Sequence, residues 1–287
     1  MPTYVFPGQG AQTKGMGADL FSQFPDLVQS ANKILGYSIE TICLENPDDK
    51  LNQTQYTQPA LFIVNALAYL KKIQESPRSP DFFAGHSLGE YNALFAAGVF
   101  DFETGLRLVQ ERGRLMSQVS GGGMGAVIGL KAEDVQKVLS QRDLKGLTIA
   151  NYNSYLQIVV AGPQESISKA APVFEAAGAR MFIPLQVSGA FHSPYMQSAQ
   201  QAFEKFIQPF NFASPAVPVI ANLNARPYPA NDIQGTLVHQ ITRGVQWTQT
   251  IEYLLDKGQS IFEEVGPGRR VLTGLIAQIQ KARTTIG

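Results

Sequence analysis

The sequence predicts an α/β fold in which a large domain is built on a parallel sheet and a smaller domain is inserted into it. A strand, a sharp turn and a helix follow one another over residues 82–97, as in α/β-hydrolase-like domains. The order βαββαβ over residues 125–186 is ferredoxin-like and can close as a domain of its own. We therefore expect a large α/β-hydrolase-like domain over 1–123 and 188–287 and a small ferredoxin-like domain over 124–187.

The N-terminal part begins with a short strand, residues 4–6, and continues with helices. The strand ends at the glycine- and proline-rich turn 7–10, where backbone amides can approach a ligand; a plain strand-to-helix connection is the alternative. Apolar residues recur at helical spacing over 20–72. Within this segment Thr57-Gln58-Pro59 predicts a helix that opens with proline in its first turn.

A serine stands at the apex of the sharp turn, with Gly85 and Gly89 two residues away on either side. Such a nucleophile elbow holds Ser87 in a strained, exposed position, and glycine leaves room for the backbone that crosses close by. The helix behind it directs free N–H groups and the positive end of its dipole at charge formed on the serine oxygen. The turn predicts an acyl-transferring nucleophile, and an ordinary glycine-bounded loop is the alternative.

An arginine emerges from the apolar stripe of the helix predicted over 102–119. Arg112 has apolar residues three and four positions away in both directions, so its guanidinium must find an anion or bear a large desolvation cost. The anion could be a carboxylate of the protein, or the head could reach water along the core. The sharper hypothesis is a substrate carboxylate gripped bidentately.

The middle and C-terminal parts alternate between strands and helices. A hinge is expected at 120–123, followed by the inserted strands 125–130, 147–152, 157–162 and 181–186 and helices 132–141 and 164–177. The large domain then resumes with strands 217–221 and 260–265 and helices 232–241, 248–257 and 270–281.

The chain has three histidines, and one is well placed to act as a base. His192 follows a strand end and a small-residue turn, so it can project from a loop. His86 points away from the neighbouring serine, and His239 lies in a helical segment. An elbow serine needs a base, which makes His192 the candidate, although no acid presents itself as a third member.

Composition excludes several function classes. The 287 residues contain 23 Lys+Arg and 23 Asp+Glu, so no long-range field favours nucleic acid or an anionic membrane. The single cysteine excludes an intramolecular disulfide, and neither a secretory signal nor a membrane-spanning run is visible. We expect a cytoplasmic protein that binds no metal. Without long heptads, we expect a monomer.

Ordered motifs over nearly the whole length resemble the malonyl-CoA:acyl-carrier-protein transacylase family. They are Phe6-Pro7-Gly8-Gln9-Gly10, Thr57-Gln58-Pro59-Ala60-Leu61, residues 85–89, Arg112, Asn151-x-Asn153-Ser154, Ala190-Phe191-His192, Val245-Gln246-Trp247, Gly266-Pro267-Gly268 and residues 271–275. The sequences of segments 36–39, 54–58 and 97–102 are most similar to those of the discrete acyltransferases that serve trans-acyltransferase polyketide synthases. Arg269-Arg270 departs from the single lysine of many relatives, and Gly189 from a histidine that malonyl-specific modular domains often have.

The resemblance assigns the catalytic roles. It implies Ser87 as nucleophile, His192 as base and the backbone N–H groups of Gln9 and Leu88 as the oxyanion hole. It also implies that a main-chain carbonyl, at Gln240, orients the histidine in place of an acid.

The resemblance also assigns substrate contacts. Arg112 would clamp the malonyl carboxylate and Phe191 would crowd an α-methyl branch; His86 completes the expected substrate-binding residues. The implied reaction is malonyl transfer from malonyl-CoA, through a serine ester, to the phosphopantetheine thiol of an acyl carrier protein, with no cofactor. A housekeeping fatty acid enzyme, a carrier-protein thioester hydrolase and a non-catalytic docking scaffold are the alternatives.

Overall fold

The computed structural model describes residues 1–76, 78–140, 144–229 and 231–286 and contains two four-stranded sheets. The first sheet consists of β1 (Thr3–Phe6), β2 (Phe82–Gly85), β7 (Val219–Ile220) and β8 (Phe262–Glu264). Its strands are all parallel and lie in the order β7-β2-β1-β8. The expected α/β fold with a parallel sheet and a second sheet is confirmed.

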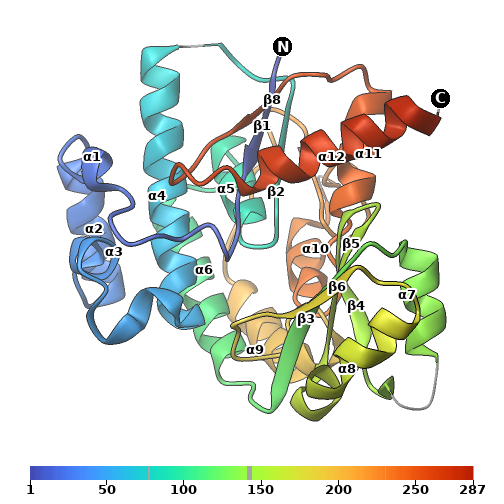
Figure 1. Cartoon of the computed structure of the whole chain (residues 1–287). Helices are drawn as coiled ribbons and strands as arrows, with labels where there is room; N and C mark the ends of the chain where they lie inside the picture. The colour runs from blue at the N-terminus through green and yellow to red at the C-terminus, as the bar shows by residue number, and fades with distance from the viewer. Residues whose placement is uncertain (77, 141–143, 230, 287) are drawn as a thin grey trace.

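Helices cover both faces of the parallel sheet (Figure 1). Side chains alternate along each strand, so Phe6 and Phe83 join the core formed with α4 (Thr54–Glu75), α5 (Gly89–Ala96) and α6 (Phe102–Ser117). Val5 and Ala84 point to the opposite face, against α11 (Trp247–Asp256) and α12 (Val271–Ile286). Burial on both faces is typical of a parallel sheet.

The remaining helices of the large body lie around this core. Three short helices and a 3₁₀ segment form a layer outside α4 and α6, and two helices follow the second sheet in sequence (Figure 1). They are α1 (Ala18–Phe21), α2 (Pro25–Leu35), α3 (Ile39–Leu44), the 3₁₀ segment Pro47–Asn52, α9 (Gln197–Ile207) and α10 (Ile233–Gln240).

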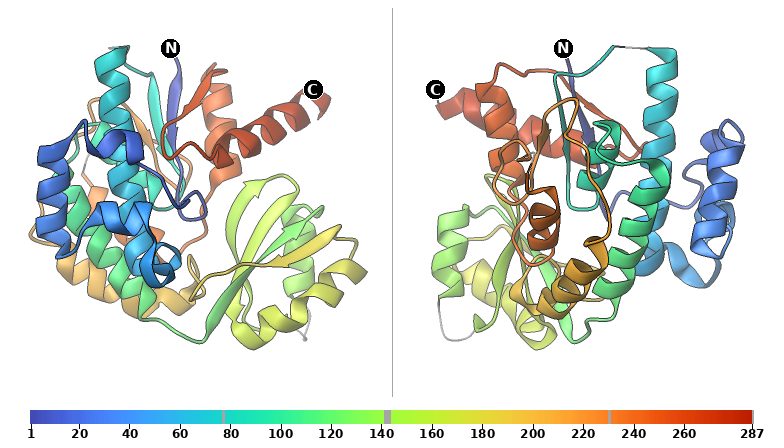
Figure 2. Two further views of the ribbon diagram at one scale, coloured as in Figure 1. Left: turned by 60° about the vertical axis from the view of Figure 1, so that its left-hand side comes forward. Right: turned by 180° about the vertical axis from the view of Figure 1, so that it is seen from behind.

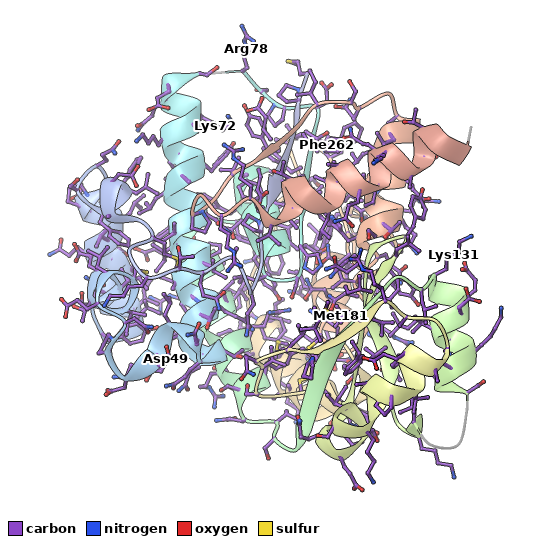
Figure 3. The ribbon with its side chains drawn as sticks, in the orientation of Figure 1. Asp49, Lys72, Arg78, Lys131, Met181 and Phe262 are labelled. Carbon is purple, nitrogen blue, oxygen red and sulfur yellow. The ribbon has the colours of Figure 1, made fainter. Side chains whose placement is uncertain are left out.

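The second sheet is antiparallel, and helices pack on one of its faces (Figure 2). Its elements run in the order β3 (Gly122–Ile128), α7 (Ala132–Leu139), β4 (Thr148–Ser154), β5 (Gln157–Pro163), α8 (Gln164–Ala176) and β6 (Met181–Pro184). The strand order is β4-β5-β3-β6. Strand β6 is therefore an edge, on which Met181 is exposed (Figure 3).

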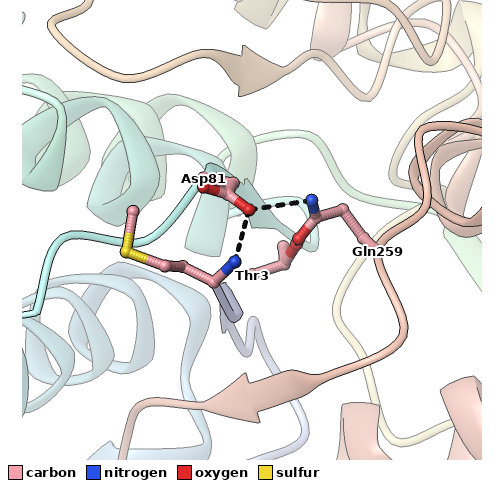
Figure 4. A network of polar contacts seen from close by, with 4 residues as sticks. Thr3, Asp81 and Gln259 are labelled. Atoms are coloured by element: carbon pink, nitrogen blue, oxygen red, sulfur yellow. Dashed lines mark hydrogen bonds and ion pairs between the residues drawn. The ribbon is translucent and has the colours of Figure 1, made fainter.

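A small polar network holds together the amino ends of three parallel strands (Figure 4). The Met1 amine donates to Asp81 Oδ2 at 2.6 Å, and Gln259 Nε2 donates to the same oxygen at 3.0 Å. Thr3 Oγ1 donates to Gln259 Oε1 at 3.2 Å. Since β1, β2 and β8 start together here, their carboxyl ends meet at the opposite edge, where open α/β sheets place ligands.

Two local predictions were wrong. The helix expected to open at residues 57–59 begins at Thr54 and contains Pro59 in its interior; the almost complete burial of residues 57–67 outweighs the backbone hydrogen bond that proline cannot make. In the expected hinge at 120–123, Gly122 and Gly123 belong to β3 and pair with β5, so the strand begins before the expected domain boundary at 124. Residue 141, at the end of one predicted helix, lies outside the described residues.

Among the described residues, no helix combines the length and the apolar character needed to cross a membrane.

Candidate active site

The turn between β2 and α5 holds Ser87 in a left-handed backbone conformation, with φ at 53°. A non-glycine residue in this region is strained, which is expected at a functional turn. Gly85 and Gly89 must be glycines because backbone atoms of neighbouring segments lie where a Cβ would be. A Cβ at Gly85 would come within 2.0 Å of the Gly89 carbonyl, and a Cβ at Gly89 within 2.0 Å of the Phe6 carbonyl oxygen. The predicted elbow is therefore present, and its apex faces the carboxyl edge of the parallel sheet.

Asn222, which sequence reasoning missed, clamps this turn from the neighbouring strand. It follows β7, the strand that pairs with β2. Its Oδ1 accepts the Ser87 backbone N–H at 2.7 Å, and its Nδ2 donates to the Gly85 carbonyl at 2.6 Å. One buried amide thus satisfies the backbone groups on both sides of His86, at the entry to the strained residue.

His192 lies directly against the serine. Its Nε2 is 2.7 Å from Ser87 Oγ, and its Nδ1 is 2.9 Å from the backbone carbonyl oxygen of Gln240. A carbonyl only accepts, so Nδ1 carries the proton, and in the neutral ring Nε2 is free to accept the serine proton. His192 also has a positive φ, 55°. The two residues therefore form a hydrogen-bonded pair in two strained turns.

The surroundings keep this imidazole neutral. Burial, and secondarily the nearby Arg112 cation, lower the pKa of His192 to about 3. Both effects disfavour a second positive charge in the site. The ring is consequently in its proton-accepting form throughout the neutral pH range.

Arg112 is buried beside the serine, with 1% of its surface exposed. Its Nη2 donates to Ser87 Oγ at 3.2 Å and to Gln240 Oε1 at 2.8 Å, and its Nη1 donates to Gln58 Oε1 at 2.6 Å. The guanidinium also lies over the Tyr91 ring, 5.6 Å from its centroid. Among the described residues it forms no ion pair with a carboxylate. Buried cations are normally paired with an anion. Because Arg112 lacks such a partner, its positive charge stays available to a ligand beside the serine.

Gln240 connects the parts of the site through both its backbone and its side chain. Besides the carbonyl that receives His192, its Nε2 donates to the Ser87 carbonyl at 2.8 Å and to Glu90 Oε2 at 2.5 Å. Its Oε1 then faces Arg112. The sequence pointed only to its backbone.

These groups open onto a cavity of about 140 Å³ between the two sheets. It is lined by Gln9, Gln58, His86, Ser87, Leu88, Arg112, Met116, Met124, Asn151, Asn153, Val159, Leu185, Val187, Phe191 and His192. A larger hollow of about 590 Å³ lies between α7, the β4–β5 turn and α11, and none of the predicted site residues lines it.

The other predicted substrate and oxyanion residues line the cavity, whereas His239, which the sequence analysis had set aside, lies away from it. His86 contacts Asn153 Oδ1 through Nε2 at 2.8 Å, so it faces the small sheet and not the serine. Phe191 is buried and lines the cavity. The backbone N–H groups of Gln9 and Leu88 have no hydrogen-bond partner in the described part of the chain. His239 is exposed on α10.

Sequence reasoning missed Asn222, Glu90 and the side chain of Gln58. Gln58 stands inside one of the motifs and Glu90 directly follows another, and a polar residue within an apolar helical segment was the available signal. No group of three or more His, Cys, Asp or Glu that could hold a metal is found where the structure describes the chain.

Comparison with known proteins identifies the family. The acyl transferase domain model matches residues 3–285. The polyketide biosynthesis malonyl CoA-acyl carrier protein transacylase PksC of Bacillus subtilis is 56% identical over 282 residues, 98% of each chain. The solved malonyl CoA-acyl carrier protein transacylase of Burkholderia pseudomallei superposes with a TM-score of 0.94 at 47% identity, covering 98% of each chain.

A third match shows a relative with its partner. A solved complex of a type II polyketide synthase acyl-carrier protein with its malonyl-transacylase has a TM-score of 0.92 at 36% identity, covering 97% of this chain and 93% of that one. Both the site and these matches point the same way. The chain belongs to the acyl transferase domain family and is an acyltransferase.

Proposed function

We propose that this protein transfers a malonyl group from malonyl-CoA, through an ester on Ser87, to the phosphopantetheine thiol of an acyl carrier protein, in trans for a polyketide synthase. The observation that carries the proposal is the buried, unpaired guanidinium of Arg112 within 3.2 Å of the Ser87 hydroxyl. A cation in this position favours an acyl group that ends in a carboxylate. The names of the relatives support the same donor and acceptor.

The first half-reaction uses the serine and the histidine as a pair. His192 Nε2 takes the hydroxyl proton as Ser87 Oγ attacks the thioester carbonyl. The tetrahedral intermediate collapses, the C–S bond breaks, and the imidazolium returns the proton to the departing CoA thiolate. The products are malonyl-serine and CoA–SH.

The second half-reaction reverses these roles. The carrier thiol gives its proton to His192, its sulfur attacks the ester carbonyl, and the C–Oγ bond breaks as Ser87 takes the proton back. Atoms and charges balance in both steps with these residues and the two thiols. We therefore propose that no metal or redox cofactor takes part.

The oxyanion of both intermediates needs donors that are free in the resting enzyme. We assign these to the backbone N–H groups of Gln9, after β1, and Leu88, at the start of α5. Both residues line the cavity. Removing one such donor typically costs about 10²–10³ in rate.

We propose that further residues of the cavity wall also act in acyl selection. Phe191 would crowd an α-methyl branch on the acyl chain, and His86, held by Asn153, would contact the thioester end of the substrate. The small volume, about 140 Å³, suits a three-carbon diacid better than a long chain.

We also propose the finer description of the fold. The parallel sheet with its elbow supports an α/β-hydrolase-like large domain over 1–123 and 188–287. The antiparallel order β4-β5-β3-β6 with two helices on one face supports a ferredoxin-like small domain, expected over 124–187, whose first strand begins at Gly122. A cytoplasmic location and a monomeric state stay predictions.

Intact-mass spectrometry tests the proposal. The protein is mixed with malonyl-CoA, with and without a phosphopantetheinylated carrier protein, and Ser87→Ala serves as control. We expect a malonyl adduct that is absent from Ser87→Ala and that moves to the carrier when it is added. Rapid release of free malonate would instead identify a hydrolase, and the absence of any adduct would identify a docking scaffold.

A further inference from the structure

A carboxylate that the mechanism does not use lies directly behind the nucleophile. Glu90, the second residue of α5, has 0% of its surface exposed. It forms no ion pair with a cation in the described part of the chain. Burying a carboxylate without a paired cation costs desolvation free energy. The presence of Glu90 at this position therefore needs a physical explanation.

Each oxygen of Glu90 receives hydrogen bonds that lead to a different part of the site. Oε1 accepts the backbone N–H of Asn222 at 2.9 Å and the hydroxyl of Tyr228 at 2.7 Å. Asn222 in turn clamps the elbow through the Ser87 N–H and the Gly85 carbonyl. The first oxygen therefore holds the residue that fixes the nucleophile turn.

The second oxygen of Glu90, Oε2, is connected to the Arg112 guanidinium through the side chain of Gln240. Oε2 accepts from Gln240 Nε2 at 2.5 Å. Because this amide nitrogen also donates to the Ser87 carbonyl, Gln240 Oε1 is left facing Arg112 Nη2 at 2.8 Å. An amide between the two charges holds Arg112 in place and keeps Glu90 from neutralising it directly.

We propose that Glu90, as a carboxylate, is a positioning residue that fixes the nucleophile turn through Asn222 and the substrate-binding guanidinium through Gln240. The proposal rests on malonyl transfer as the function. An ionised carboxylate accepts on both oxygens and carries no donor, whereas a carboxamide donates from one side and a protonated acid carries one O–H donor beside its remaining acceptor capacity. A donor aimed at the Asn222 N–H or the Gln240 Nε2–H opposes it, so the ionised form satisfies both donors best.

The ionisation of Glu90 gives the proposal a pH readout. Burial raises the pKa of Glu90 to about 7, against the opposing effects of its three hydrogen bonds and of Arg112. The other ionisable groups around it are Arg112 from α6, Tyr228 from the segment before α10, Tyr91 on α5 itself and His192. Burial raises the pKa of both tyrosines and lowers the pKa of His192 to about 3, so none of these titrates near neutrality.

The experiment measures single-turnover acylation of Ser87 by malonyl-CoA and by acetyl-CoA between about pH 5.5 and 8.5, before any carrier thiol is added. In the natural protein we expect malonyl acylation to rise with pH around a midpoint of about 7. In Glu90→Gln we expect it to be roughly 10- to 100-fold lower above neutrality, without that rise. Glu103→Gln, an exposed carboxylate on α6, is the matched control and should keep the natural profile.

A second variant keeps the test decisive if Glu90→Gln fails to fold. The Tyr228 hydroxyl favours the ionised carboxylate, so Tyr228→Phe should move the rise to higher pH while the rate reached at high pH is retained. A merely structural role for Glu90 predicts lost thermal stability without any shift of the profile.

Two results would overturn the inference: a folded Glu90→Gln protein with the natural acylation rate, or a natural protein whose rate shows no rise near neutral pH. The proposed function fails separately, if the natural protein accepts acetyl but not malonyl groups. The comparison is then made on acetyl acylation, where loss of the Asn222 arm still predicts a slower Glu90→Gln.

Discussion

The two parts of the molecule on either side of the cavity have interiors built on opposite principles. Around the elbow, buried polar groups are hydrogen-bonded to one another, and they include a serine, a histidine, an arginine and a glutamate. Among the described residues of the small sheet and its helices, no charged side chain is buried, and the interior consists of residues such as Val135, Val160, Ile167, Phe174 and Phe182. Burying the charged groups of the first interior costs free energy of folding, whereas burying the apolar side chains of the second stabilises the fold.

The difference between the two interiors matches a division of roles between catalysis and the shape of the cavity. The large body supplies each group that we assign to bond making: the nucleophile, the base, the amides and the cation. The small sheet supplies cavity wall, with Met124 from β3, Val159 from β5 and Asn151 and Asn153 from β4. Changes in the polar core should therefore alter rate and acyl selection, and changes in the apolar core should alter stability alone.

The largest effect should come from the polar core. His192→Ala removes the imidazole that is placed to take the Ser87 proton, so we expect malonyl-serine formation to fall by about 10⁴–10⁶. Quench-flow with intact-mass detection measures the rate. His239→Ala, an exposed histidine on α10, should react normally. A residual rate within tenfold of the natural one would mean that proton removal does not depend on this imidazole.

Arg112→Ala should produce the next largest effect. Losing a bidentate, charge-assisted grip should slow malonyl loading by roughly 10²–10³ while acetyl loading remains, so the ratio of the two falls. Arg114→Ala is the matched control, because Arg114 lies on the same helix but is exposed and paired with Glu111. The clamp hypothesis is abandoned if Arg112→Ala still prefers malonyl over acetyl as strongly as the natural protein.

The part of the site that could be predicted from the sequence is the part carried by local pattern. Ser87 was visible because glycine spacing predicts a sharp turn, and Arg112 because a cation interrupts an apolar stripe. Both signals lie within a few residues of the side chain concerned. The strands around them were equally local, and most were predicted within three residues of their bounds.

What could not be predicted depends on the order of strands in space. Asn222 follows a strand of only two residues, β7, and reaches the elbow because that strand pairs with β2. The residues next to Asn222 in the sequence do not indicate that it lies beside the Ser87 turn. The start of α4 was misplaced for a related reason, since Pro59 suggests a first turn and only tertiary burial extends the helix back to Thr54.

A pair of adjacent valines on β5 sharpens the comparison, because their side chains face opposite cores. Val160 is fully buried in the apolar core of the small sheet, and Val159 lines the cavity. Val160→Ala removes two buried methyl groups, so we expect the free energy of unfolding to fall by about 2–3 kcal/mol, measured by urea titration. The malonyl-to-acetyl ratio should stay unchanged in this variant and shift in Val159→Ala. A shifted ratio in Val160→Ala would show that the two cores are not independent.

The smallest expected effect concerns the cavity wall beside the base. Phe191 is buried with 5% of its surface exposed and lines the cavity next to His192. Phe191→Ala should make room for an α-methyl branch and raise methylmalonyl loading, relative to malonyl, by about tenfold, the scale of one methylene in an apolar pocket. Competition between the two CoA esters, read as the ratio of adduct masses, measures it. Tyr195→Ala, exposed three residues after His192, controls for disturbance of the loop. If the ratio does not move, the ring sets the histidine's position and not the width of the acyl site, and malonyl-serine formation itself should then slow in Phe191→Ala.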